Sequence, residues 1–211
     1  MALTTPPTRD KAVARQKWLT AATIGWNGVE GVVAITAGIA AGSVSLIGFG
    51  LDSGIEVSAA LILAWRLAQE RRTGCKQEAD RRAQRLIALS FAVLAVYVGV
   101  ESTRDLVLAD RPEESLVGIV MAALSLAVMP ALARAKRQQA PLMGSRAVEA
   151  EAKQTVLCAL MSGGLLVGLG ANAALGWWWA DPLAGLFIAS LAVYETVAVW
   201  RADSLEDTCC G

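Results

Sequence analysis

Six apolar runs dominate this sequence of 211 residues, and each is long enough to cross a lipid bilayer as a helix. A hydrocarbon core about 30 Å thick needs about 20 helical residues, whose backbone groups then bond within their own segment. The runs cover residues 18–41, 44–67, 84–108, 115–135, 147–174 and 181–201. The sequence therefore predicts an all-α integral membrane protein with six transmembrane helices.

Basic residues favour one side of this predicted membrane domain. They precede the first run, lie between the second and third and between the fourth and fifth (Lys136 and Arg137 among them), and follow the sixth, whereas the opposite side carries Arg104 and Arg111. Since connections rich in lysine and arginine stay in the cytoplasm, we expect both termini to be cytoplasmic in a multi-pass protein of the cell (plasma) membrane. The predicted parts are a cytoplasmic N-terminal tail over 1–17, the six-helix domain over 18–201 and a short cytoplasmic C-terminal tail over 202–211.

The composition excludes several classes of function. Hydrophobic residues make up 55% of the chain and charged residues 18%, which is too apolar for an ordinary soluble domain of this length. The net charge is zero, so we expect no attraction to nucleic acid. The chain has no histidine, which removes imidazole catalysis and histidine metal sites. Residues 48–52, GFGLD, miss the spacing of the G-x-G-D element of intramembrane aspartyl proteases by one residue, and we expect no enzyme.

Acidic residues near the middle of the predicted helices point to a function. A charged side chain at the bilayer centre costs about 2.5–3.5 kcal/mol on insertion scales, and Glu30, Asp52 and Glu56 all fall there. Asp52 and Glu56 are four residues apart, so their carboxylates share one helix face and repel each other. A bound cation, a shared proton or a basic partner must compensate. Because every basic residue is predicted away from the middle of a helix, a cation or a proton is favoured, as in a proton-coupled exchanger.

Other polar residues are candidates for the same cavity. Asn27 and Glu30 lie three residues apart in the first run, and Gln154 and Cys158 lie four apart in the fifth. A lone cysteine is more often a small buried apolar residue than a ligand, and both readings stay open for Cys158. Glu195 falls in the inner part of the sixth run and is expected near the cytoplasmic interface.

Several further residues have plain structural readings. Ser43, Ser115 and Asp181 precede predicted helices as N-caps. Glycines spaced for close helix packing are found at Gly38/Gly42, Gly50/Gly54 and Gly164/Gly168. Trp177, Trp178 and Trp179 fit an interfacial aromatic belt. The adjacent Cys209 and Cys210 are read as part of a free tail, with capture of a soft metal as the alternative.

Two stretches of the sequence resemble a known family. Residues 43–56, SVSLIGFGLDSGIE, are similar to the second transmembrane helix of the cation diffusion facilitators, and residues 180–185, ADPLAG, resemble the start of their sixth helix. The resemblance implies six helices, a homodimer and metal/proton antiport, mostly of zinc. It places Asp52 and Glu56 on one pair of ligand positions and Gln154 and Cys158 on the second pair, where the family usually has histidine or aspartate. In a departure from the usual family pattern, we expect a transmembrane-only member without the family's cytoplasmic C-terminal domain.

The chemistry of the candidate ligands completes the prediction. Carboxylates alone favour hard cations, and a thiolate shifts the preference towards Zn²⁺ and Cd²⁺. We therefore expect efflux of a divalent metal cation, zinc first, with no resident cofactor and with protons, the lipid bilayer and a second copy of the chain as partners. The expected ligands are Asp52, Glu56, Cys158 and Gln154, with Asn27 and Glu30 as orienting or alternative ligands. Two alternatives stay open, namely export of a small organic cation and a non-transporting membrane subunit.

Overall fold

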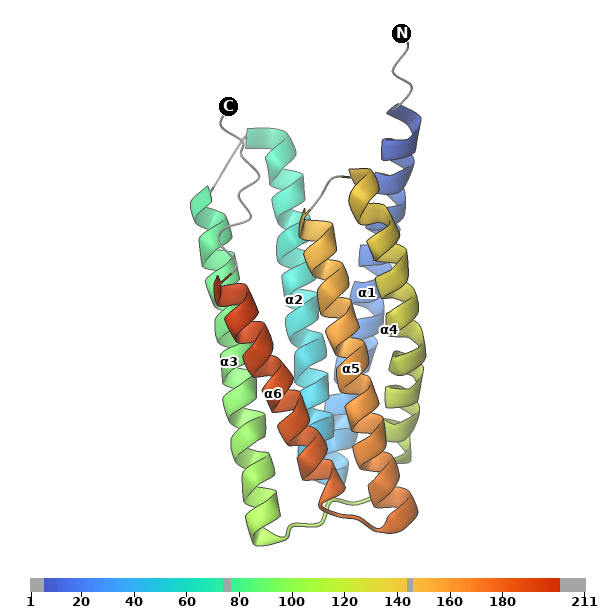
Figure 1. The fold of residues 1–211 in the computed structure, drawn as a ribbon, viewed down its shortest axis with the longest axis vertical. Helices are drawn as coiled ribbons and strands as arrows, with labels where there is room; N and C mark the ends of the chain where they lie inside the picture. Colours follow the sequence, from blue (N-terminus) through green and yellow to red (C-terminus); the bar gives the residue numbers. More distant parts are fainter. Residues whose placement is uncertain (1–5, 74–76, 144–145, 202–211) are drawn as a thin grey trace.

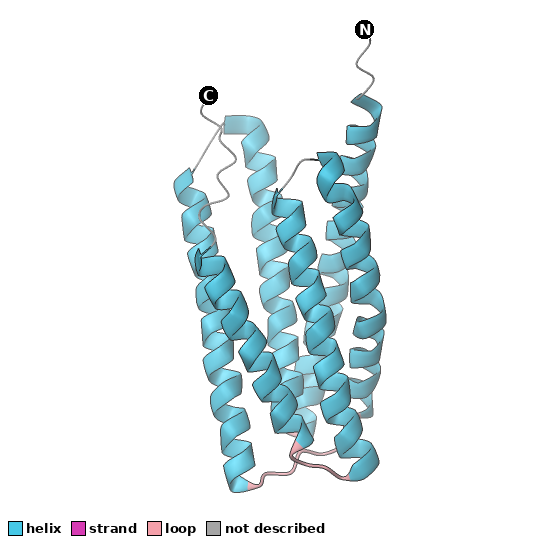
Figure 2. Ribbon diagram, in the orientation of Figure 1, coloured by secondary structure: helices cyan, strands magenta, loops and turns pink. Residues whose placement is uncertain are grey.

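The computed structural model describes residues 6–73, 77–143 and 146–201 of the chain. It has six helices and, over the described residues, no strand, as Figure 2 shows. The helices are α1 (Pro6–Ala41), α2 (Val44–Thr73), α3 (Gln77–Leu108), α4 (Leu116–Met143), α5 (Arg146–Leu175) and α6 (Ala180–Arg201). The predicted all-helical architecture is confirmed, although α1 begins well before the predicted start of the first span. The predicted tail over 202–211, with Cys209 and Cys210, lies outside the described residues.

The six helices run up and down in a single bundle (Figure 1). One end, here called the tail end, is where α1 begins and α6 ends. The opposite end, here called the loop end, holds the connections at residues 42–43, 109–115 and 176–179. The assignment of the tail end to the cytoplasm stays a prediction from the basic residues.

Within the described residues, five of the helices are long and apolar enough to cross a membrane. Their spans are Ala14–Ala41, Val44–Leu61, Leu116–Gln139, Ala152–Leu175 and Ala180–Arg201. Helix α3 runs beside them over a similar length, but its turns near the loop end carry Glu101, Arg104 and Asp105. Arg104 and Glu101 form an ion pair of 3.2 Å there. The chain is therefore a multi-pass membrane protein.

The bundle buries many polar side chains beside its apolar core and exposes large apolar side chains on its outer surface. Val32, Val107, Leu116 and Val167 are each between 66% and 78% exposed. Buried positions in contrast include Asn27, Glu30, Asp52, Ser53, Glu56, Ser125, Lys136, Thr155 and Glu195. An exposed apolar surface over this length suits lipid, and polar groups in such a protein face the interior of the bundle.

Glycines allow α1 and α2 to approach closely. A Cβ on Gly50 would lie 2.9 Å from the Ile35 nitrogen and 3.0 Å from the Gly31 oxygen, and one on Gly38 would lie 2.9 Å from the Ile47 nitrogen. This contact sets the polar face of α1 directly against the acidic face of α2. Of the glycines predicted to pack, Gly38, Gly50, Gly164 and Gly168 do meet neighbours, whereas a Cβ on Gly42 or Gly54 would meet nothing within 4 Å.

Two of the three predicted helix caps are confirmed. The Leu46 amide donates to the Ser43 hydroxyl at 3.2 Å, and the Gly118 amide donates to Ser115 at 3.1 Å. The N-cap prediction for Asp181 is wrong, because α6 begins one residue earlier and Asp181 lies in its first turn. Its carboxylate instead accepts hydrogen bonds from the hydroxyls of Ser43, at 2.7 Å, and Ser45. Asp181 thus ties α6 to α2 at the loop end.

Candidate metal centre

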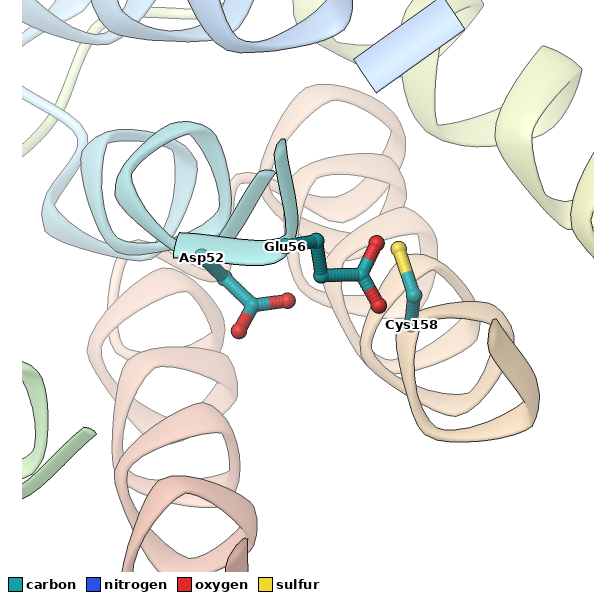
Figure 3. A group of neighbouring side chains, drawn as sticks. All are labelled: Asp52, Glu56 and Cys158. Atoms are coloured by element: carbon teal, nitrogen blue, oxygen red, sulfur yellow. The ribbon is translucent and has the colours of Figure 1, made fainter. Parts of the chain in front are cut away.

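Three potential metal ligands meet in the middle of the bundle. Asp52 and Glu56 project from one face of α2, and Cys158 reaches them from α5 (Figure 3). One ligand atom from each residue lies within 4.8 Å of the other two. All three side chains are buried, with exposures of 3%, 6% and 1%. The structure therefore brings together the two helices on which the sequence placed its ligands.

This spacing suits a single metal ion. Ligand atoms around a tetrahedral zinc, bound at about 2.0–2.3 Å, stand about 3.5 Å apart. The observed separations, all within 4.8 Å, are longer than that value at their upper limit, so the ligand atoms would have to move inwards to bind an ion. In Figure 3 the Glu56 carboxylate points at the Cys158 sulfur, with the Asp52 carboxylate on the same side of α2. Two carboxylates and a thiolate form a donor set that borderline divalent ions accept.

Glu30 joins this cluster to the surrounding helices. Its carboxylate is fully buried and accepts hydrogen bonds from the Trp26 indole at 2.6 Å, from Ser53 at 2.9 Å and from Ser125. The Cys158 thiol lies 4.0 Å from the same carboxylate. With three donors already on its oxygens, Glu30 is better placed to orient Cys158 than to bind an ion in place of Asp52 or Glu56.

Asn27 contacts one of the candidate ligands directly. Its amide nitrogen donates to the Glu56 carboxylate at 2.5 Å, which fixes one of the two carboxylate oxygens. Its own Oδ1 is buried and has no hydrogen-bond partner among the described residues. An oxygen of this kind beside the cluster could complete the coordination of a hard or borderline cation.

Gln154 is less closely associated with the cluster. It lies one turn from Cys158 towards the tail end and is partly buried, and its amide nitrogen has no hydrogen-bond partner in the part of the chain that the structure describes. Its role as a ligand stays a prediction.

Lys136 is a residue that sequence reasoning placed wrongly. It was expected in the connection after the fourth span, but α4 continues to Met143 and the Lys136 side chain is fully buried. Its ammonium donates to the Thr155 hydroxyl at 3.1 Å and interacts electrostatically with Glu56. The expectation that no basic group comes near the acidic pair is therefore wrong. The burial of Lys136 could have been predicted from its spacing. Met129, Ala133 and Lys136 lie four and three residues apart, which places them on one face of α4, and this face is buried.

Glu195 was also expected in the wrong environment. It lies on α6 at 9% exposure, on the same face as Ile188 and Ala192, and its charge acts on Asp52 rather than facing the interface. The serines at positions 53 and 125 were missed as well, because a serine in a membrane helix gives no signal until its partner is known.

The arrangement defines a polytopic membrane protein with a buried anionic cluster on two helices, which is the construction of a cation transporter. The family model of the cation efflux transmembrane domain matches residues 21–205. The chain therefore belongs to the cation efflux family, whose members are metal cation transporters and not enzymes. No curated protein matches the chain significantly.

Proposed function

We propose that this protein exports a divalent metal cation, with zinc as the first candidate, in exchange for protons. The observation that supports this most directly is the cluster of Asp52, Glu56 and Cys158, whose ligand atoms lie within 4.8 Å of one another in the bundle interior. The thiolate beside two carboxylates favours Zn²⁺ or Cd²⁺ over Mg²⁺. Export, the cell membrane and a homodimer are parts of the same proposal and follow the family resemblance.

A polar face on α1 supports access from the tail end. Its members recur every three or four residues, so they form one stripe along the helix. They are Gln16, Thr20, Thr23, Asn27 and Glu30. The stripe runs from the first turns of the apolar span to the Asn27–Glu56 hydrogen bond. With the tail end in the cytoplasm, a cytoplasmic ion would follow this face to reach the cluster.

Competition between metal and protons would couple the two fluxes. Carboxylates and a thiol bind metal only after they lose their protons, so metal binding releases protons and protons displace metal. In the proposed cycle the deprotonated cluster takes metal from the tail end, the helices rock, and protons from the loop end release it. The cluster then returns in its protonated form.

Geometry favours this proposal over its alternatives. Ligand atoms a few ångströms apart fit a bare ion, whereas an organic cation needs a wider cavity lined by apolar side chains. A non-transporting subunit would have no need for the ionisable cluster, whose burial is costly.

Reconstitution in liposomes tests the proposal. Uptake of Zn²⁺, Cd²⁺, Mn²⁺ and Mg²⁺ is measured with and without a pH gradient for the wild type, Asp52→Asn and Cys158→Ala. The matched control is Asp110→Asn, an exposed residue at the loop end. We expect proton-driven Zn²⁺ flux in the wild type and control, and none in Asp52→Asn. Equal flux in wild type and Asp52→Asn would reject the site, and equal flux after Cys158→Ala would remove α5 from it.

A further inference from the structure

Lys136 is the one buried basic side chain among the described residues of this bundle. Five buried carboxylates share the described interior with it, namely those of Glu30, Asp52, Glu56 and Glu195 and, at the loop end, that of Asp181. A buried ammonium is costly unless it is paired and hydrogen-bonded. The charges around it are therefore part of the reason it can be there.

The position of Lys136 relates it to the proposed ion site. Its ammonium contacts Thr155, and Thr155 precedes Cys158 by three residues on α5, which is about 4.5 Å along the helix axis. Side chains on a helix lean towards its N-terminus, and α4 begins at the loop end, so Lys136 leans from the tail end back towards the middle. The ammonium thus lies about one turn to the tail side of the cluster, within the electrostatic reach of Glu56.

A fixed positive charge at this point has two consequences. In the ion-free protein it balances part of the negative charge of the acidic pair, which would otherwise repel. When a divalent cation occupies the cluster, the same ammonium repels it, because like charges in a medium of low dielectric interact over several ångströms.

We propose that Lys136 is a tethered cation that balances Glu56 when the cluster holds no ion, and that it limits how tightly the cluster retains a divalent metal. The first half stands on the buried charges alone, and the second half rests on the proposed function. A transporter must release its ion as well as bind it, and a resident competitor keeps affinity in a range that permits release. A lysine that only fills space would have neither effect.

A double-mutant cycle tests the first half without any metal. Thermal unfolding is measured in detergent with a chelator for the wild type, Lys136→Gln, Glu56→Gln and the double variant. We expect each single variant to unfold at a lower temperature, and the double variant to lose clearly less than the sum of the two. If Lys136→Gln cannot be purified as folded protein, Lys136→Met takes its place. If a Lys136 variant folds only when combined with Glu56→Gln, that result counts as coupling. The proposal is overturned if the drop in unfolding temperature of the double variant equals the sum of the two single drops. It is also overturned if the Lys136 variants fail to fold equally with and without Glu56→Gln.

Zinc affinity tests the second half. Competition with a chromophoric chelator gives the Kd for Zn²⁺ in the wild type, Lys136→Gln and Lys153→Gln, which removes an exposed lysine from α5. We expect Lys136→Gln to bind Zn²⁺ at least about tenfold more tightly, and Lys153→Gln to match the wild type. A purely structural role would weaken binding, so unchanged or weaker binding overturns the second half. If the unfolding temperatures show coupling between Lys136 and Glu56 but the wild type binds no Zn²⁺, zinc transport is rejected. The charge balance between Lys136 and Glu56 is then still supported.

Discussion

The α3–α6 pair and the group formed by α1, α2, α4 and α5 bury very different side chains. Around α3 and α6 the described core is apolar and consists of Val44, Phe91, Leu94, Ala95, Val98, Ala189 and Ala192. The four-helix group also has an apolar core, which includes Leu46, Phe49, Met129 and Leu165. In addition it buries a polar network that runs from Trp26 through Glu30 to Ser53, Ser125 and Cys158. Among the described residues, apolar packing dominates the first region, whereas the second region adds hydrogen bonds and charges to its apolar packing. From α6, Glu195 acts electrostatically on Asp52, and Asp181 accepts hydrogen bonds from Ser43 and Ser45 at the loop end.

This difference assigns separate tasks to the two regions. A dry interface of small and branched side chains resists change because its packing is dense. A polar network in the membrane is costly unless every member is satisfied, so it is kept where it serves an ion or a proton. We therefore expect substitutions in the four-helix group to change transport, and substitutions in the α3–α6 interface to change stability.

The largest expected effect is that of Glu56→Gln. The substitution keeps the shape of the side chain but removes one of the three anionic donors of the cluster. We expect Zn²⁺ flux in liposomes to fall by about 100-fold or more, since loss of a metal ligand removes a whole charge-assisted bond. The control is Glu114→Gln, an exposed glutamate in the loop-end connection. Flux within threefold of the wild type would show that the cluster is not the transport site.

The second largest expected effect is that of acidification, which weakens metal binding. Protons and metal compete for the carboxylates of Asp52 and Glu56 and the thiol of Cys158, so binding is strong when these groups are deprotonated and falls as the pH falls. Each displaced proton contributes about a tenfold loss of affinity per pH unit in the range where the cluster titrates. Zinc titrations of the purified protein at a series of pH values measure the slope. A Kd independent of pH would contradict proton coupling.

Asn27→Ala is expected to have an intermediate effect. The Asn27 amide holds one oxygen of Glu56 at 2.5 Å, and its loss frees the carboxylate to rotate. Residues that orient metal ligands typically contribute 10–100-fold in affinity, and we expect Zn²⁺ binding to weaken within that range. Measurement of the Kd beside that of Thr36→Ala, an exposed α1 residue bonded to its own helix, separates this effect from a change in α1. Equal affinities would leave Asn27 without a part in the site.

The sequence was sufficient for the helices and for one half of the site. The apolar runs fixed the six helices, and the spacing of Asp52 and Glu56 placed both on one face of α2, because these are properties of a single segment. The placement of Lys136 failed for a related reason. The predicted fourth span ended at its first charged residues, whereas α4 continues because Thr155 and the acidic interior receive the ammonium.

Contacts between helices could not be predicted in the same way. Glu30 accepts from Ser53 on α2 and Ser125 on α4, and the choice of those serines depends on the rotation and depth of three helices. Periodicity restricts the rotation of each helix but leaves its depth relative to the others open. Close approach at Gly31 and Gly50 settles that depth for α1 and α2, and it is visible only when both backbones are placed.

A smaller effect on Zn²⁺ affinity is expected from a substitution that moves α1 and α2 apart. A Cβ on Gly50 would lie 2.9 Å from the Ile35 nitrogen, so Gly50→Ala must push α1 away from α2. Overpacking of this kind lowers the free energy of unfolding by about 1–3 kcal/mol, and we expect Zn²⁺ affinity to fall several-fold as Asn27 separates from Glu56. Gly54→Ala is the matched control on α2, because its Cβ would meet nothing within 4 Å. Similar behaviour of the two variants would show that the approach does not position the site.

The smallest effect on transport is expected from Val98→Ala in the α3–α6 interface. Val98 is fully buried among apolar side chains, and truncation removes two carbon atoms from that packing. At about 0.8 kcal/mol for each buried carbon, with a further contribution from the cavity, the free energy of unfolding should fall by about 1.5–3 kcal/mol. Thermal unfolding in detergent and Zn²⁺ flux per reconstituted molecule are measured on the same preparation. We expect a lower unfolding temperature with flux within twofold of the wild type. A large loss of flux in a chain that stays folded would show that α3 and α6 move with the site during transport, and the division of tasks between the two regions would not hold.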